Sequence, residues 1–221
     1  MKNFSLIVSA TLALVLAPAA LALADGALYV TPKLGIASVN AKALDESERK
    51  TLVPFGLAVG YDLNPVRAEL EYAFRAKKEF ASYVDTDEGP GYSSSDSGKL
   101  KLGVQTLFLN GYYDIHNSSS ITPYVGLGLG LAKLSYDLTN EGFDTFGGIS
   151  ESYSEKYSGS KTKFAWNIGA GAAYQINDLM ALDLGYRYAN FGKVSLDLGE
   201  GGGPEIKSNA HEVMLGLRFS F

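Results

Sequence analysis

The last twelve residues, Ala210–Phe221, alternate between apolar and polar side chains with a period of two. Every odd position from Val213 to Phe221 is bulky and apolar, whereas the even positions include Glu212 and Arg218. This pattern predicts a β-strand with one apolar and one polar face. Such a strand at a free terminus would be an adhesive edge on a soluble protein. The pattern therefore favours an apolar face turned to lipid and a backbone paired with the first strand.

The same alternation predicts seven earlier strands. They are expected at Ala27–Val39, Leu52–Leu63, Val66–Lys77, Lys99–Asp114, Ile121–Leu134, Lys163–Ile176 and Leu179–Phe191. The phase changes near Gln105-Thr106, where we expect a β-bulge, and Pro32 is expected at another local bulge. Short turns should alternate with long polar loops. The loops are expected at Asn40–Lys50, Lys78–Gly98, Thr139–Lys161 and Gly192–Ser208.

An even number of strands joined alternately by short turns and long loops is typical of bacterial outer-membrane barrels. The predicted fold class is all-β: an eight-stranded antiparallel up-and-down transmembrane β-barrel. A soluble lipocalin-like barrel is the main alternative, with apolar residues inside around a ligand. The apolar face here is bulky on nearly every strand, and the opposite face carries Gly, Ala or charge, which suits a narrow lumen.

The first 24 residues resemble a signal peptide that is followed by a barrel domain at 25–221. Lys2 precedes a run of apolar and small residues, and Ala22 and Ala24 fit the A-x-A rule for cleavage before Asp25. The alternative is a membrane-anchor helix, because the run approaches the length that spans a bilayer. Pro18 and the small residues before Asp25 favour cleavage.

Composition narrows the classes further. The 221 residues include 25 Gly, 14 Tyr and 11 Phe, which suits a small barrel with a tight interior and aromatic rims. Cysteine is absent, so no disulfide framework or thiolate metal site is expected. The net charge of −5 disfavours nucleic-acid binding. We expect no cofactor and no bound metal.

Several segments carry a resemblance to a known family. They are the Ala22-Leu23-Ala24 site and the stretches 122–130, 184–188 and 213–221, whose letters are TPYVGLGLG, LGYRY and VMLGLRFSF. With these, the chain resembles the small eight-stranded outer-membrane barrels that include opacity-type surface proteins and OmpA-like transmembrane domains. The resemblance implies surface exposure and roles in adhesion, immune recognition or envelope integrity. It also implies that Phe219 and Phe221 belong to a signal read by the outer-membrane assembly machinery.

The polar faces of the predicted strands carry nine charged residues that should face the lumen. They are Lys33, Arg67, Glu69, Glu71, Arg75, Asp183, Arg187, Glu212 and Arg218. They could line a pore or form a charge-pair gate, or they could form a salt-bridge network that fills the barrel. Buried charges must pair or meet water, and the two signs nearly balance, which favours the network.

The sequence favours a non-enzymatic surface protein of the bacterial outer membrane, with four extracellular loops for adhesion, surface interaction or envelope integrity. Its expected partners are outer-membrane lipid and lipopolysaccharide, the assembly machinery, and a host or cell-surface ligand at the loops. The alternatives are a narrow porin-like channel and a lipid-modifying enzyme. The enzyme would need a nucleophile and a base such as Ser208 and His211, but no catalytic motif surrounds them.

Overall fold

The structure is a computed structural model that describes residues 27–43, 46–195 and 205–221. The predicted signal peptide and its cleavage site lie outside these ranges. One antiparallel sheet of nine strands holds almost all of the described residues. The strands are β1 (Ala27–Ala43), β2 (Glu46–Leu52), β3 (Pro54–Asp62), β4 (Val66–Gly89), β5 (Tyr92–Asp114), β6 (Ile121–Phe146), β7 (Ile149–Asn177), β8 (Met180–Ser195) and β9 (Glu205–Ser220). No helix in the described part of the chain is long and apolar enough to cross a bilayer.

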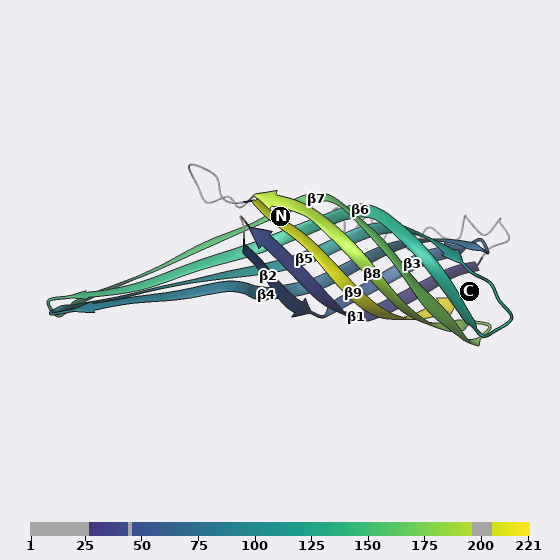
Figure 1. Ribbon diagram of the computed structural model, residues 1–221, viewed down its shortest axis with the longest axis horizontal. Helices are drawn as coiled ribbons and strands as arrows, with labels where there is room; N and C mark the ends of the chain where they lie inside the picture. Colours follow the sequence, from purple (N-terminus) through teal and green to yellow (C-terminus); the bar gives the residue numbers. More distant parts are fainter. Residues whose placement is uncertain (1–26, 44–45, 196–204) are drawn as a thin grey trace.

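The sheet closes into a ring, because β1 pairs with β3 on one side and with β9 on the other (Figure 1). β2 and β3 are separated only by Val53, and both pair with β1, so together they occupy one position in the ring. The ring therefore has eight strand positions, and the predicted eight-stranded antiparallel barrel is confirmed. Full closure leaves no unpaired edge around the ring.

The outer face of the ring is apolar, as the alternation predicted. Bulky side chains on the outward parity are exposed, and Leu127 keeps 61% of its surface accessible. Neighbouring strands continue the band with Leu34, Ile36, Phe55, Leu57, Leu109, Val125, Leu129, Phe164, Ile168, Leu184, Val213 and Leu215. An apolar surface that encircles a protein in this way is the pattern of a lipid-facing barrel.

The two ends of the barrel differ. Short turns at 63–65, 115–120 and 178–179 lie at one end, which we call the turn end. The seam closes there, because the Phe221 amide donates a hydrogen bond to the Leu28 carbonyl. At the other end, β4, β5, β6 and β7 continue far beyond the ring as a four-stranded extension (Figure 1). We call this extension, residues 82–99 and 139–156, the tower.

The tower corrects two of the predicted loops. Lys78–Gly98 and Thr139–Lys161 are hairpin strands rather than irregular loops. The first predicted loop, Asn40–Lys50, is likewise mostly a hairpin of β1 and β2. Over most of their length, these segments have water on both faces and polar side chains on both, so they lack the apolar-polar contrast that reveals a strand. Ala41 and Phe80 are exceptions, because both are buried inside the barrel. Most of the fourth predicted loop, residues 196–204, lies outside the described ranges.

Both predicted bulges were wrong. β5 pairs with β6 in one unbroken register from Tyr92 to Asp114, so no bulge lies at Gln105-Thr106. The register shifts occur in β4, between Arg75 and Lys78 and again between Glu79 and Ala81. Pairing of β1 with β9 is interrupted around Pro32, but the register is the same on both sides of the gap. The missing donor of proline explains the interruption without an inserted residue.

Candidate functional site

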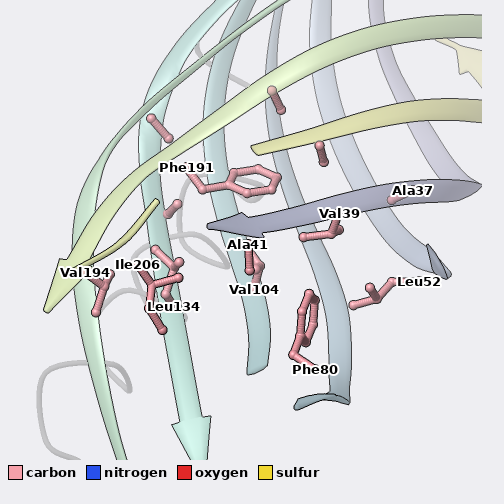
Figure 2. Close-up of a cluster of buried hydrophobic side chains, with 14 of the residues drawn as sticks. Ala37, Val39, Ala41, Leu52, Phe80, Val104, Leu134, Phe191, Val194 and Ile206 are labelled. Atoms are coloured by element: carbon pink, nitrogen blue, oxygen red, sulfur yellow. The ribbon is translucent and has the colours of Figure 1, made fainter. Parts of the chain in front are cut away.

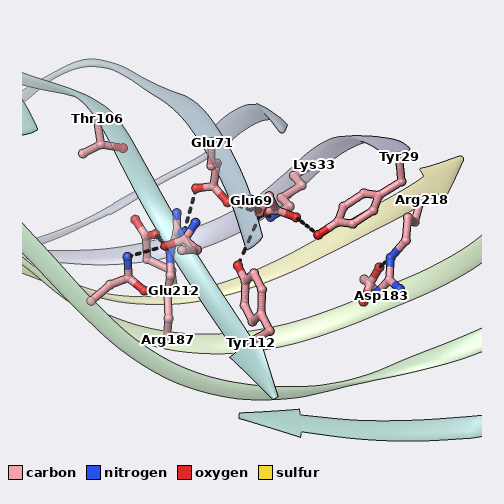
Figure 3. A network of polar contacts seen from close by, with 12 residues as sticks. Tyr29, Lys33, Glu69, Glu71, Thr106, Tyr112, Asp183, Arg187, Glu212 and Arg218 are labelled. Carbon is pink, nitrogen blue, oxygen red and sulfur yellow. Dashed lines mark hydrogen bonds and ion pairs between the residues drawn. The ribbon is translucent and has the colours of Figure 1, made fainter. Parts of the chain in front are cut away.

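Six charged side chains form one chain of alternating sign across the middle of the lumen (Figure 3). Glu71 accepts hydrogen bonds from Lys33 at 2.7 Å and from Arg187 at 2.6 Å. Glu212 accepts from Arg187 at 2.7 Å and from Arg75 at 2.6 and 2.8 Å, and Lys33 also pairs with Glu69. The six residues come from β1, β4, β8 and β9, so the chain ties opposite walls of the barrel together.

Two bidentate ion pairs lie nearer the turn end. Arg218 binds Asp183 at 2.8 and 3.0 Å. Arg67 binds Asp114 at 2.7 and 2.9 Å. Its guanidinium lies 4.9 Å from the ring centre of Tyr112 and 5.1 Å from that of Tyr124. All nine charged residues singled out from the sequence therefore lie in the lumen and in ion pairs.

Asp114 is the lumen charge that sequence reasoning missed. The nine expected residues comprise five cations and four anions, which leaves one cation without a partner. Asp114 supplies the fifth anion from the end of β5. A signal for it existed: Asp114 has the same parity as Thr106 and Asn110 when a period of two is kept along the whole strand.

The part of the lumen nearest the tower is apolar (Figure 2). This apolar layer is formed mainly by Val39, Leu52, Phe80, Val104, Leu134, Phe191, Val194 and Ile206, with alanines between them. It corrects the expectation that only small and ionic residues face inward. Leu100, Leu102 and Val104 on β5 face the lumen because they belong to or pack against this layer, so their parity needs no bulge.

The apolar layer and the ionic chain are in direct contact. The Arg75 guanidinium lies 5.0 Å from the ring centre of Phe191, and that of Arg187 lies 5.8 Å from the ring centre of Phe108. Cation–π contacts of this kind stabilise a charge that has left water. The lumen is thus filled in three successive layers: two ion pairs with tyrosines, the chain of six charges, and the apolar side chains.

A small cavity remains between the two ionic layers. It measures about 50 Å³ and is lined by Lys33, Glu69, Asp183 and Arg187 among others. Because a water molecule needs roughly 10–15 Å³ of such volume, the cavity has room for a few waters. The walls are close: a Cβ on Gly128 would lie 2.0 Å from the Asn110 oxygen that binds Asn167. Any larger residue there would displace the hydrogen-bonded amides of Asn110 and Asn167.

The two residues weighed for enzymatic chemistry do not meet. Ser208 is buried and faces the lumen, whereas His211 is exposed on the outer face. Nδ1 of His211 is 2.7 Å from the Tyr186 hydroxyl, and its ring lies against Tyr188. Trp166 packs beside Tyr188 with ring centres 5.6 Å apart. This outward cluster has the composition of a membrane-interface belt. Tyr124, by contrast, is buried and lines the lumen cavity.

The tower is an ordered sheet. β4 and β7 form its edges, and the pairings continue in register to the hairpin tips at Gly89–Tyr92 and Phe146–Ile149. Between strands, the Tyr153 hydroxyl donates a hydrogen bond to Asp96 at 2.6 Å. That bond stabilises the protonated phenol, so it raises the pKa of Tyr153 to about 12.

The composition of the tower is unlike that of the barrel. It holds eight acidic residues and two lysines, namely Asp85, Asp87, Glu88, Asp96, Glu141, Asp144, Glu151 and Glu155 against Lys99 and Lys156. At its tip, Tyr92 pairs with Phe146 and Phe146 pairs with Ile149, so three large apolar side chains lie side by side. Phe146 is 78% exposed and Ile149 is 72% exposed. We call these three residues the tip patch.

Comparison with known proteins agrees with this geometry. The model of the outer membrane protein beta-barrel domain matches residues 7–219. Outer membrane protein PagN of Salmonella typhimurium is 33% identical, with all of both chains covered. A Rickettsia bellii protein named "Putative adhesin" is 28% identical, with 97% of each chain covered. The crystal structure of neisserial surface protein A has a TM-score of 0.56 at 21% identity and covers 90% of this chain and 100% of its own.

The closed ring of eight strand positions, the apolar outer band and the nearly complete family match all lead to one assignment. A ring with lipid-facing residues outside and ionic residues inside is a membrane structure, and the relative that matches over both whole chains is an outer-membrane protein. The chain belongs to the family of outer-membrane proteins with a β-barrel domain and resides in the bacterial outer membrane.

Proposed function

We propose that this protein is a non-enzymatic surface protein that mediates adhesion through its tower. The tip patch carries the proposal, because exposed apolar side chains in water mark contact sites. Three adjacent large residues surrounded by carboxylates resemble the apolar centre and polar rim of a protein interface. The name of the Rickettsia bellii relative supports the same role. The filled barrel provides a rigid base that holds the patch away from the membrane.

The charge of the tower indicates the chemistry of the partner. Eight carboxylates against two lysines attract a basic surface and repel polyanions, which gives the encounter both speed and selectivity. The partner is therefore a basic protein surface with an apolar depression. Its binding to the tower should weaken as salt is raised, because the exposed charges are screened.

The test is a cell-adhesion assay with bacteria that express tip variants. Replacing Tyr92, Phe146 and Ile149 by Ser should lower adhesion at least tenfold, since a few central apolar residues dominate most interfaces. The matched control replaces Tyr83 and Val84 by Ser, because these are also exposed tower residues but lie at its base. Equal surface amounts are verified by labelling intact cells. Adhesion that survives the tip substitutions, or that falls equally in the control, contradicts the proposal.

A narrow channel is the second candidate, and the polar cavity among the lumen charges favours it. Against it, the apolar layer lies between this cavity and the tower end. Ions would pass through the barrel only if the side chains of the apolar layer moved apart. The enzyme alternative has weaker support, because Ser208 and His211 lie on opposite faces of β9. If the protein modifies no lipid, the mass of lipid A should be the same in cells with and without the expressed protein.

We further propose that residues 1–24 are removed at export and that Phe219 and Phe221 direct assembly. The exposed Phe221 at the β9–β1 seam supports the second part. Mass spectrometry of the outer-membrane protein should give a chain that begins at Asp25. Removing Phe221 should lower the amount of folded, heat-modifiable barrel, whereas removing one residue from the tower tip should not. An uncleaved chain, or normal assembly without Phe221, contradicts the respective part.

A further inference from the structure

Three lysines form a row across neighbouring strands at the tower end of the barrel. Lys193 on β8 is paired directly with Lys207 on β9, and Lys207 is paired directly with Lys42 on β1. All three are exposed and have the outward parity, because Val194, Ile206 and Ala41 beside them face the lumen. Like charges directly opposite each other destabilise a sheet. A row of three therefore carries a cost that a bound anion would remove.

The positive charge of the row is only partly neutralised by the acidic side chains that the structure describes. Lys193 is 3.1 Å from the Glu205 carboxylate, and both groups are about half exposed. Lys42 and Lys207 have no such ion pair within the described residues. One more cation lies beside the row on the outward face: Arg49 on β2, which is opposite Asn40 and one level below Lys42. The basic belt, as we call Lys42, Arg49, Lys193 and Lys207, crosses four adjacent strands: β8, β9, β1 and β2.

The outer face changes in steps toward this belt. Leu184, Leu215 and Leu34 form an apolar row across β8, β9 and β1. Four residues further along each strand toward the tower, Tyr188 and His211 form part of the interface cluster with Trp166. The next level is a row of amides: Asn190, Asn209 and Asn40. The lysine row follows directly above it.

This order places the belt at the depth of lipid headgroups. Four residues separate His211 from Lys207, which is about 13 Å along a strand and roughly 9 Å along the bilayer normal at a tilt of about 45°. The headgroup region is roughly 5–8 Å thick on each side. The backbone of the belt therefore lies at the outer boundary of the headgroups, and lysine side chains that extend back toward the membrane bring their ammonium groups to the headgroups of the outer leaflet.

We propose that the basic belt, through Lys42, Lys193 and Lys207 above all, binds the phosphate groups of phosphorylated glycolipids in the outer leaflet. The inference rests on the outer-membrane location of the barrel and is independent of the proposed adhesion. Phosphate monoesters carry up to two negative charges and several acceptor oxygens, so one headgroup neutralises two adjacent lysines. The belt lies on β8, β9, β1 and β2, whereas β4, β5, β6 and β7 form the tower (Figure 1). The basic residues of the belt and the acidic residues of the tower are therefore on different strands.

The test uses the folded full-length barrel in zwitterionic nanodiscs that contain either diphosphoryl lipid A or its dephosphorylated form. Binding of the diphosphoryl lipid should fall about 25-fold when Lys42 and Lys207 are both changed to Gln, because each basic residue near an anionic surface contributes about fivefold. The double change to Arg should retain binding. The matched control, Lys99→Gln with Lys156→Gln in the tower, should bind as the unchanged protein does.

Three results would overturn the proposal. The first is unchanged binding by the Gln variant. The second is equal binding of the dephosphorylated lipid by the unchanged protein. The third is complete competition by millimolar inorganic phosphate or by a soluble sulfated polysaccharide, which would identify a soluble anion as the ligand. If the Gln variant folds poorly, two other comparisons decide the outcome: binding by the Arg variant, and binding of the two lipids by the unchanged protein. The Arg variant keeps both positive charges, so loss of binding in this variant would also contradict the proposal.

Discussion

Glu212 is the residue on which the ionic chain depends most. It is fully buried and accepts hydrogen bonds from both Arg75 and Arg187. Such a pair is not strong support for stability in itself, because removing both charges from water is costly. Removing a single partner is different, since the remaining charges stay buried without compensation.

We therefore expect Glu212→Ala to lower the free energy of unfolding by about 3–5 kcal/mol. The measurement is urea unfolding in detergent, followed by the heat-modifiable shift on gels. The matched control is Asp137→Asn, which removes a partly exposed pair with Lys77 and should cost about 0.2–1 kcal/mol. Equal effects of the two substitutions would mean that the lumen charges are hydrated and not a packed network.

Phe80 tests the apolar layer at the same scale. The sequence placed it in a polar loop, where truncation would be neutral, but the structure buries it against the layer. Phe80→Ala should lower the free energy of unfolding by about 3–5 kcal/mol. Phe146→Ala, at the exposed tip, should change it by no more than about 0.5 kcal/mol. A neutral Phe80→Ala would disprove that the lumen has an apolar layer.

At the scale of elements, the membrane strands were predictable and the tower was not. Residues such as Leu127 and Gly128 lie in lipid and in a narrow lumen, so alternation is strict where the two environments differ. Tower strands meet water on both faces, and nothing in Ser93–Asp96 distinguishes a strand from a loop. Lumen charges were predictable from parity alone. Their partners were not, because pairs such as Arg75 and Glu212 join residues 137 positions apart.

The tower should be dispensable for folding of the barrel, because the apolar layer includes no tower residue. Replacing residues 83–98 and residues 140–155 each by Asn-Gly would connect the paired positions Ser82–Lys99 and Thr139–Lys156 through two-residue turns. We expect the shortened protein to keep its heat-modifiable shift and to lose adhesion. Failure of this variant to fold in detergent would show that the tower and the barrel are one cooperative unit.

The molecule as a whole is a cylinder whose lumen is filled with side chains, with an acidic projection at one end. Within the described residues, five cations and five anions of the lumen form ion pairs, and the apolar layer lies between them and the tower. In planar bilayers, the purified protein should therefore give no stable conductance at ordinary voltages. Glu212→Ala, which breaks the ionic chain, should at most add brief, irregular currents. Sustained and ion-selective channels from the unchanged protein would favour the porin-like alternative.

The most direct test of the account is the orientation of the barrel in the outer membrane. The chain has no cysteine, so single-cysteine variants can be labelled without background. Ser152→Cys places a thiol in the tower, and Ser118→Cys places one in a short turn at the opposite end. With a membrane-impermeant maleimide, we predict labelling of Ser152→Cys on intact cells and of Ser118→Cys only after the outer membrane is permeabilised. The reverse result, or equal labelling of both on intact cells, would contradict a barrel that spans the membrane with its tower outside.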